Sequence, residues 1–217
     1  MGTFYIIDGM RRPWRHWLTW TGFGLGLLAL AYALLEALCR YRDKRVFPPG
    51  IDLFCELLPL WDWTAFLGVG FLLFIAGFFL YWLIQEPKRV PYLVIATAMM
   101  MLVRDAFLLL TPVAALPGLM PLYTGGVAAR LHGTLLHDQE LFFSGHTAVP
   151  FLYFLLCRAD KPVALACLAV SLLNAAGVLL TRNHYSIDVL GAFFIVPTIV
   201  LITRRLFGGL DPETAPA

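Results

Sequence analysis

The chain has 217 residues, of which 60% are hydrophobic and 14% charged, and its mean hydropathy is +0.77. A soluble domain carries roughly 25% charged residues, so this composition argues against an ordinary soluble domain and favours a membrane protein. The formal net charge is only +2. Because no basic stripe interleaved with aromatic residues accompanies it, we expect no nucleic-acid partner.

Six apolar stretches are expected to form membrane helices. In chain order they are Trp17–Leu38, Thr64–Ile84, Pro91–Leu110, Leu141–Cys157, Val163–Leu180 and Tyr185–Leu206. Most could cross a hydrocarbon core about 30 Å thick, and an apolar segment in lipid must satisfy its backbone as a helix. The fourth is short and contains Pro150, so we expect it to begin below the interface. The sequence predicts an all-α, polytopic bundle of six transmembrane helices over residues 17–207, flanked by an N-terminal cytoplasmic or interfacial segment (1–16) and a C-terminal tail (208–217).

The basic residues predict how the bundle is oriented. With a cytoplasmic N-terminus, nine Lys and Arg side chains outside the spans fall on the cytoplasmic side and six on the other. This bias favours cytoplasmic N- and C-termini. Cys39 and Cys55 bracket the first outer loop, and the sequence leaves open whether they form a disulfide.

Two patterns within the spans are expected to serve packing and the membrane interface. Gly22-x-x-x-Gly26 is a small-residue face suited to close helix contact. Aromatic residues at the ends of spans are typical of an interfacial belt, and here they are Trp61, Trp63, Trp82 and Tyr185.

Ionisable residues within a span, or at its mouth, are costly in a bilayer and indicate a functional site. Arg104 lies in the third span, residues 140–146 open the fourth, and His184-x-x-x-Asp188 opens the sixth. Two antiparallel helices separate His146 from His184, so both histidines are expected at one membrane face. The third span runs towards that face and brings Arg104 to it. Asn174, in the middle of the fifth span, is expected to form a hydrogen bond between helices.

The residue types at this face suit the binding of phosphate. The helix N-terminus at Ser144, Gly145 and His146 presents unpaired N–H groups to an anion, and Gly145 allows close approach to the backbone. Arg104 supplies a forked cation.

The same face carries groups that suit acid–base and nucleophilic chemistry. Asp188 lies one helical turn after His184 and can orient its imidazole, which makes His184 a candidate nucleophile or base. His146 can act as the general acid. In the alternative interpretation both histidines are simply solvated interfacial side chains. Zinc is disfavoured because no third ligand stands at metal spacing, so we expect neither a metal nor another cofactor.

Two motifs resemble the signatures of the sphingomyelin synthase family, part of the wider lipid phosphatase (phosphatidic acid phosphatase type 2) superfamily. They are Phe143-Ser-Gly-His146-Thr147 and His184-Tyr-Ser-Ile-Asp188-Val. The resemblance extends over the six-span core, and it implies a His-His-Asp triad facing the exoplasmic side. It assigns His184 as nucleophile or base, Asp188 as its partner and His146 as the acid. It also matches Glu140 to a carboxylate before the first motif.

The chain departs from the lipid phosphatase patterns Lys-x6-Arg-Pro, Pro-Ser-Gly-His and Ser-Arg-x5-His-x3-Asp. Thr111 stands in place of the first pattern's Arg, Phe143 in place of Pro, and Gly177-Val178 in place of Ser-Arg. Two cations are therefore missing, which favours a singly charged phosphodiester over a phosphate monoester. Arg182 could restore one of them.

The motifs and their departures from the family patterns lead to three hypotheses for the function. The first is a sphingomyelin synthase-type enzyme that transfers a phospho-headgroup to a lipid alcohol or to water. The second is a lipid phosphate or polyprenyl diphosphate phosphatase, and the third is a non-catalytic lipid-binding protein or transporter. The expected partners are phospholipid and lipid-alcohol substrates and the bilayer; the sequence does not predict the oligomeric state.

Overall fold

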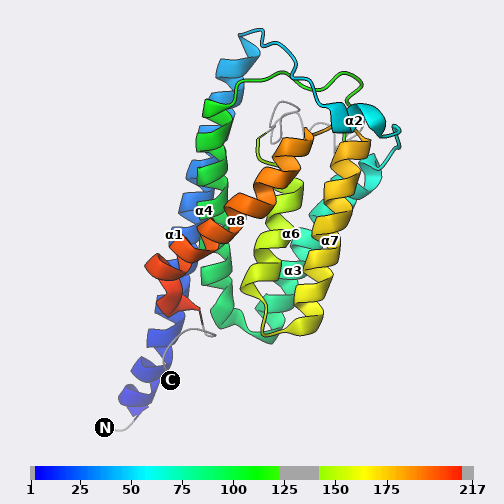
Figure 1. The fold of residues 1–217 in the computed structure, drawn as a ribbon. Helices are drawn as coiled ribbons and strands as arrows, with labels where there is room; N and C mark the ends of the chain where they lie inside the picture. The colour runs from blue at the N-terminus through cyan, green and yellow to red at the C-terminus, as the bar shows by residue number, and fades with distance from the viewer. Residues whose placement is uncertain (1–2, 123–141, 212–217) are drawn as a thin grey trace.

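The structure is a computed structural model that describes residues 3–122 and 142–211, apart from the side chains of residues 3–13 and 43. The described part is helical and contains no strand, which confirms the all-α prediction. Its longer helices are α1 (Thr3–Asp43), α3 (Phe71–Gln85), α4 (Val90–Leu110), α6 (Gly145–Leu156), α7 (Lys161–Leu180) and α8 (Ser186–Phe207) (Figure 1). The short elements are α2 (Leu53–Leu57), a π-helical turn η1 (Phe66–Gly70), and the 3₁₀ turns η2 (Pro87–Arg89) and η3 (Gly208–Leu210).

Five helices of the described chain are long and apolar enough to cross a membrane, which identifies an integral membrane protein. They cover Trp14–Arg42, Phe66–Gln85, Pro87–Leu110, Lys161–Leu180 and Ser186–Leu210. The remaining predicted span is α6, an apolar helix of 12 residues. At 1.5 Å per residue it is roughly 18 Å long, shorter than a hydrocarbon core, which agrees with the short fourth stretch in the sequence.

The helices alternate in direction, so the starts of α6 and α8 and the end of α4 lie at one end of the bundle (Figure 1). α1 packs along α4, while α6 packs between α7 and α8. The described ends of the chain lie at the opposite end of the bundle, as Figure 1 shows. Helix α1 continues through the expected boundary at residue 16. The division into three segments stays a prediction.

Aromatic and aliphatic side chains form the core around α4 and α6. Slightly more than half of the apolar window of α4 is buried, compared with about a fifth of that of α1 and of α3. The rings of Phe78 and Tyr153 stack at 3.9 Å between α3 and α6. Large apolar side chains on the outer helices remain exposed, among them Leu73, Leu165, Phe194 and Leu201. Such a surface suits lipid contact.

The prediction that Gly22 and Gly26 form a close helix contact is wrong for contacts within the described chain. A Cβ at Gly22 or Gly26 would meet nothing within 4 Å, whereas a Cβ at Gly24 would lie 3.0 Å from side-chain atoms of Val94 and Ile95. Residues two apart on a helix point to nearly opposite sides. The helix α1 therefore turns Gly24 towards α4, and the other two glycines away from it.

The predicted interfacial belt is correct only in part. Trp61 is 62% exposed, but Trp82 and Tyr185 are 2% and 5% exposed. No disulfide joins Cys39 to Cys55, two residues that both lie in the described chain. Cys39 packs with residues of α1 and α4, while Cys55 packs with Tyr185. The possible pairing is therefore not present.

Candidate functional site

A histidine and a carboxylate meet at the start of α8, although His184 lies two residues before the helix begins and not on its face as expected. His184 Nδ1 lies 3.3 Å from Asp188 Oδ2, and the same oxygen accepts a hydrogen bond from the Tyr185 N–H at 2.9 Å. The exposed fractions of His184 and Asp188 are 4% and 1%. A carboxylate held in this way favours a proton on Nδ1, which leaves Nε2 as the ring nitrogen available for chemistry.

The start of α6 is joined directly to α8. Ser144 caps α6, its Oγ accepting the Thr147 N–H at 3.4 Å, and the Ser144 N–H donates to the Asp188 main-chain carbonyl at 3.1 Å. The rings of His146 and His184 have centroids 6.5 Å apart. The structure thus brings the two predicted histidines together, as the antiparallel helix argument requires.

Arg104 ties α4 to the same helix start. Its side chain is buried, and its Nε donates to the Phe143 carbonyl at 2.8 Å. A Cβ at Gly145 would lie 3.5 Å from that Nε, so the glycine backbone packs against the guanidinium. Three helices therefore converge on one buried cluster at this end of the bundle.

A residue of the first outer loop also caps α8. Asp52 accepts hydrogen bonds from the Cys55 N–H at 3.0 Å, from the Ser186 N–H, and from the Ser186 hydroxyl at 3.1 Å. Burial raises the pKa of Asp52, but these hydrogen bonds outweigh burial and hold the pKa below its usual range. The loop is thereby anchored two residues from His184.

Cys55, in the same loop, is fully buried, and its Sγ lies 3.8 Å from the His184 carbonyl. Burial, with the Asp52 carboxylate beside it, raises the pKa of the Cys55 thiol to about 11. The thiol is therefore protonated at neutral pH and is a poor nucleophile, so it belongs to the packing of the loop.

Tyr185 binds the segment that follows α4 and so holds it beside the start of α8. Its hydroxyl accepts the Gly50 N–H and donates to the Ala114 carbonyl, both at 2.8 Å. Burial raises the pKa of Tyr185, which keeps the hydroxyl protonated and able to donate. One residue between the predicted histidine and aspartate thus contacts both loops at this end of the bundle.

The side chain of Arg182 forms its hydrogen bond away from this cluster. Arg182 has a φ of 56°, and its Nη2 donates to the Leu58 carbonyl at 3.4 Å. Within the described chain its hydrogen bond is thus to the outer loop rather than to His184. Glu140 lies outside the described residues.

The two positions where lipid phosphatase patterns have arginine hold neutral side chains in local contacts. The Thr111 hydroxyl donates to the Phe107 carbonyl of its own helix at 2.8 Å. Val178 is fully buried in a cluster with Leu67 and Val189. Neither position supplies a cation.

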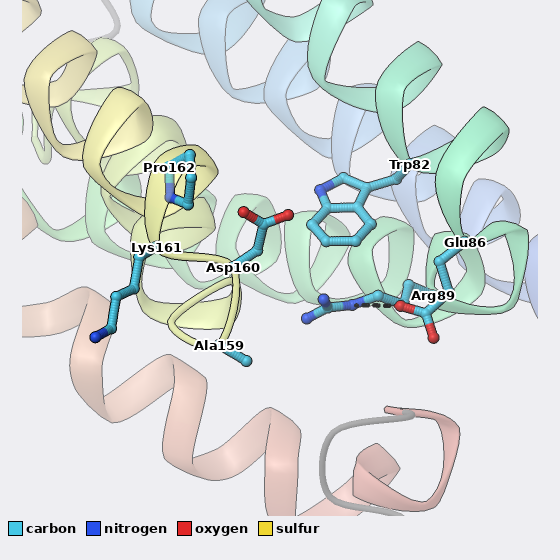
Figure 2. A pocket seen from close by; sticks show the side chains of 7 residues that line it. All are labelled: Trp82, Glu86, Arg89, Ala159, Asp160, Lys161 and Pro162. Atoms are coloured by element: carbon cyan, nitrogen blue, oxygen red, sulfur yellow. Dashed lines mark ion pairs between the residues drawn. The ribbon is translucent and has the colours of Figure 1, made fainter.

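A separate surface pocket lies at the opposite end of the bundle, where α3 turns into α4 and α6 into α7. It is lined by Trp82, Glu86, Arg89, Ala159, Asp160, Lys161 and Pro162 (Figure 2). Its charged groups serve local structure. The Arg89 guanidinium packs over the Trp82 ring at 4.1 Å and pairs with Glu86, and Asp160 caps α7. The described residues contain no cluster of metal-ligating side chains at either end.

Sequence reasoning missed Asp52, Ser186 and the hydroxyl contacts of Tyr185. Asp52 stands in a loop with other acidic residues, and its partner Ser186 is 134 residues away. The only local signal was an aspartate three residues before Cys55, the spacing of a helix N-cap.

Residues 139–205 match the family model described as PAP2 superfamily C-terminal. The matched segment contains the starts of α6 and α8 with α7 between them. It supports a relation to the lipid phosphatase superfamily, whose members are generally phosphatases or phosphotransferases, and does not single out the sphingomyelin synthase family. No curated protein and no solved structure matches the chain.

Proposed function

We propose that this membrane protein is an enzyme of the sphingomyelin synthase type. It cleaves a phospholipid on the diacylglycerol side of the phosphate and passes the phospho-headgroup to a lipid alcohol or to water. The observation that carries the proposal is the His184–Asp188 pair, 3.3 Å apart, with the His146 ring 6.5 Å from the His184 ring. Acid and nucleophile on two sides of a phosphorus atom need a separation of this order.

In the proposed first step, His184 Nε2 attacks phosphorus and forms a P–N bond. The P–O bond to diacylglycerol breaks, and His146 gives its proton to the leaving oxygen, so that diacylglycerol departs as a neutral alcohol. Asp188 stabilises the positive charge that develops on the His184 ring.

In the second step the acceptor hydroxyl attacks the phosphohistidine. His146, now neutral, takes the proton of that hydroxyl, the P–N bond breaks, and both histidines return to their starting states. The acceptor decides the outcome: a lipid alcohol gives a new phospholipid, and water gives a free phospho-headgroup.

The phosphate is proposed to bind at the start of α6. The N–H groups of Gly145 and His146 belong to the first turn of a helix and have no acceptor within it. Arg104, whose Nε is bound to the Phe143 carbonyl, brings positive charge beside that turn. Neutral side chains at Thr111 and Val178 make this a weakly cationic cradle, which suits a phosphodiester with one negative charge.

The runner-up is a lipid phosphate or polyprenyl diphosphate phosphatase, in which water is always the acceptor. The match to the PAP2 model supports this class equally. Purified protein incubated with a labelled phosphodiester lipid and, separately, a labelled phosphatidic acid distinguishes them. The proposal expects diacylglycerol and phospho-headgroup from the diester. Release of inorganic phosphate from phosphatidic acid, with no diacylglycerol from the diester, would contradict the proposal and favour the phosphatase.

The proposed site faces the extracytoplasmic side, because the excess of basic residues lies at the opposite end of the bundle. A non-catalytic lipid-binding protein remains the third reading. This third hypothesis predicts that lipid turnover is the same for His184→Ala as for wild type.

A further inference from the structure

Helix α6 contains a proline in its interior. Within Gly145–Leu156, Pro150 has no N–H to donate. In an α-helix the N–H of each residue donates to the carbonyl four positions earlier. The carbonyl that loses its helical donor here is therefore that of His146.

A side chain of the neighbouring helix takes the place of the missing N–H. Asn174, in α7, donates from Nδ2 to the His146 carbonyl at 3.0 Å. Asn174 has 0% exposed surface, so the carbonyl draws its donor from protein rather than from bulk water. The expected interhelical hydrogen bond of Asn174 is thus present. Its acceptor is the carbonyl that loses its helical N–H donor because residue 150 is proline.

A second bond one turn away in α7 provides a comparison. The Ser171 hydroxyl donates to the Thr147 carbonyl at 2.9 Å. That carbonyl also has a helical donor at the i+4 position, the N–H of Phe151. The two bonds join the same pair of helices, but only the bond from Asn174 goes to a carbonyl without a helical donor.

We propose that Asn174 is a positioning residue for His146, an inference that rests on the proposed function. The Ser144 N–H fixes the start of α6 to α8, and Asn174 fixes the following peptide to α7. The His146 ring projects from the residue held between these bonds and packs on Phe71 at a centroid distance of 4.5 Å.

Without Asn174, the partly buried His146 carbonyl must find another donor, because an acceptor without a donor and shielded from water is unfavourable. The first turn of α6 then rearranges and moves the His146 ring relative to His184. A displacement of about 1 Å in a catalytic group lowers turnover roughly 100-fold. The N–H groups of Gly145 and His146 precede the His146 carbonyl and stay anchored to α8 through the Ser144 N–H, so the effect falls on kcat more than on KM.

The test uses four variants of the full chain, purified in detergent and assayed with a labelled phosphodiester lipid: Asn174→Ala, Ser171→Ala, Pro150→Ala and the double variant Pro150→Ala/Asn174→Ala. Asn174→Ala should lower kcat about 10- to 100-fold with KM little changed. Ser171→Ala should change kcat less than about threefold. The double variant should recover most of the lost kcat, because the alanine at position 150 restores the N–H that His146 needs.

Two results would overturn the inference. One is equal loss of kcat in Asn174→Ala and Ser171→Ala, and this comparison decides the matter if Pro150→Ala is itself inactive. The other is found if Pro150→Ala alone is active but the double variant Pro150→Ala/Asn174→Ala has a kcat as low as that of Asn174→Ala. If Asn174→Ala does not fold, monodisperse protein from the double variant counts as rescue, and its absence counts against the inference.

A failure of the proposed function is distinguishable from a failure of this inference. In the first case wild-type protein turns over no lipid, and His146→Ala behaves in the same way. The hydrogen bond is then judged from unfolding in detergent, where Asn174→Ala should lower stability much less in the Pro150→Ala background. An equal loss in both backgrounds would contradict it.

Discussion

At the residue scale, the proposed chemistry depends on one shared carboxylate oxygen. Asp188 Oδ2 faces His184 Nδ1 and also accepts the Tyr185 N–H. Capping the helix and orienting the imidazole are therefore one task for this side chain. A change that preserves its shape but not its charge separates the two roles.

Asp188→Asn is predicted to lower kcat about 10³- to 10⁴-fold. The amide can keep one oxygen on the Tyr185 N–H, but its NH₂ then faces His184 and forces the wrong tautomer. Turnover of a labelled lipid and thermal unfolding in detergent measure the two effects. A kcat within tenfold of wild type would show that the pair is structural.

Asp52→Asn is predicted to lower the free energy of unfolding by about 1–2 kcal/mol at pH 7, because the charged carboxylate caps both α2 and α8. The folded pKa of Asp52 is depressed. Its contribution is therefore present above the unfolded pKa of about 3.9 and is lost as the pH falls through the folded value. Unfolding measured at pH 7, 5 and 3.5 should show the difference from wild type shrinking only below about pH 4.

The exposed acid Glu56, on the same short helix, provides the control for Asp52. Glu56→Gln should leave stability within about 0.5 kcal/mol of wild type across this range. Equal effects of the two substitutions would mean that the loop responds to total charge and not to the Asp52 cap.

At the element scale, the sequence predicted the helices and their order, and also which helix ends meet. His146, His184, Asp188 and Arg104 were identified because charged groups at span ends have no packing explanation. The Gly24 contact could not be identified, because small residues lie on two sides of α1 and only tertiary packing decides which side meets α4. The donor for the His146 carbonyl depended likewise on how α7 is rotated against α6.

Gly24→Leu is predicted to destabilise the bundle by about 1–3 kcal/mol, since its side chain would enter the space of Val94 and Ile95 on α4. Gly22→Leu and Gly26→Leu point into open space and should change stability by less than about 0.5 kcal/mol. Unfolding of the three variants in mixed micelles checks this. A larger loss of stability in Gly22→Leu and Gly26→Leu than in Gly24→Leu would support the contact face that the sequence predicted.

At the scale of the whole molecule, the candidate site and the surface pocket lie at opposite ends of the bundle. The site end carries both outer loops, and the other end carries the η2 turn, the α6–α7 turn and the described chain ends (Figure 1). The proposed orientation makes the first end extracytoplasmic. It therefore determines which leaflet supplies the substrate.

Cysteine labelling tests this orientation, because all four native cysteines are buried. With a membrane-impermeant maleimide, Lys44→Cys in the first outer loop should react in intact cells. Lys161→Cys, at the start of α7, should react only after permeabilisation. The opposite pattern would place the site in the cytoplasm.

The measurement that tests the central claim most directly is lipid mass spectrometry of cells expressing wild type or His184→Ala at equal levels. Wild type is predicted to raise diacylglycerol and either a new phospholipid or a free phospho-headgroup, at the expense of a phosphodiester lipid. His184→Ala should abolish these changes. Identical lipid profiles for the two proteins, with both correctly inserted in the membrane, would contradict a histidine-based lipid enzyme.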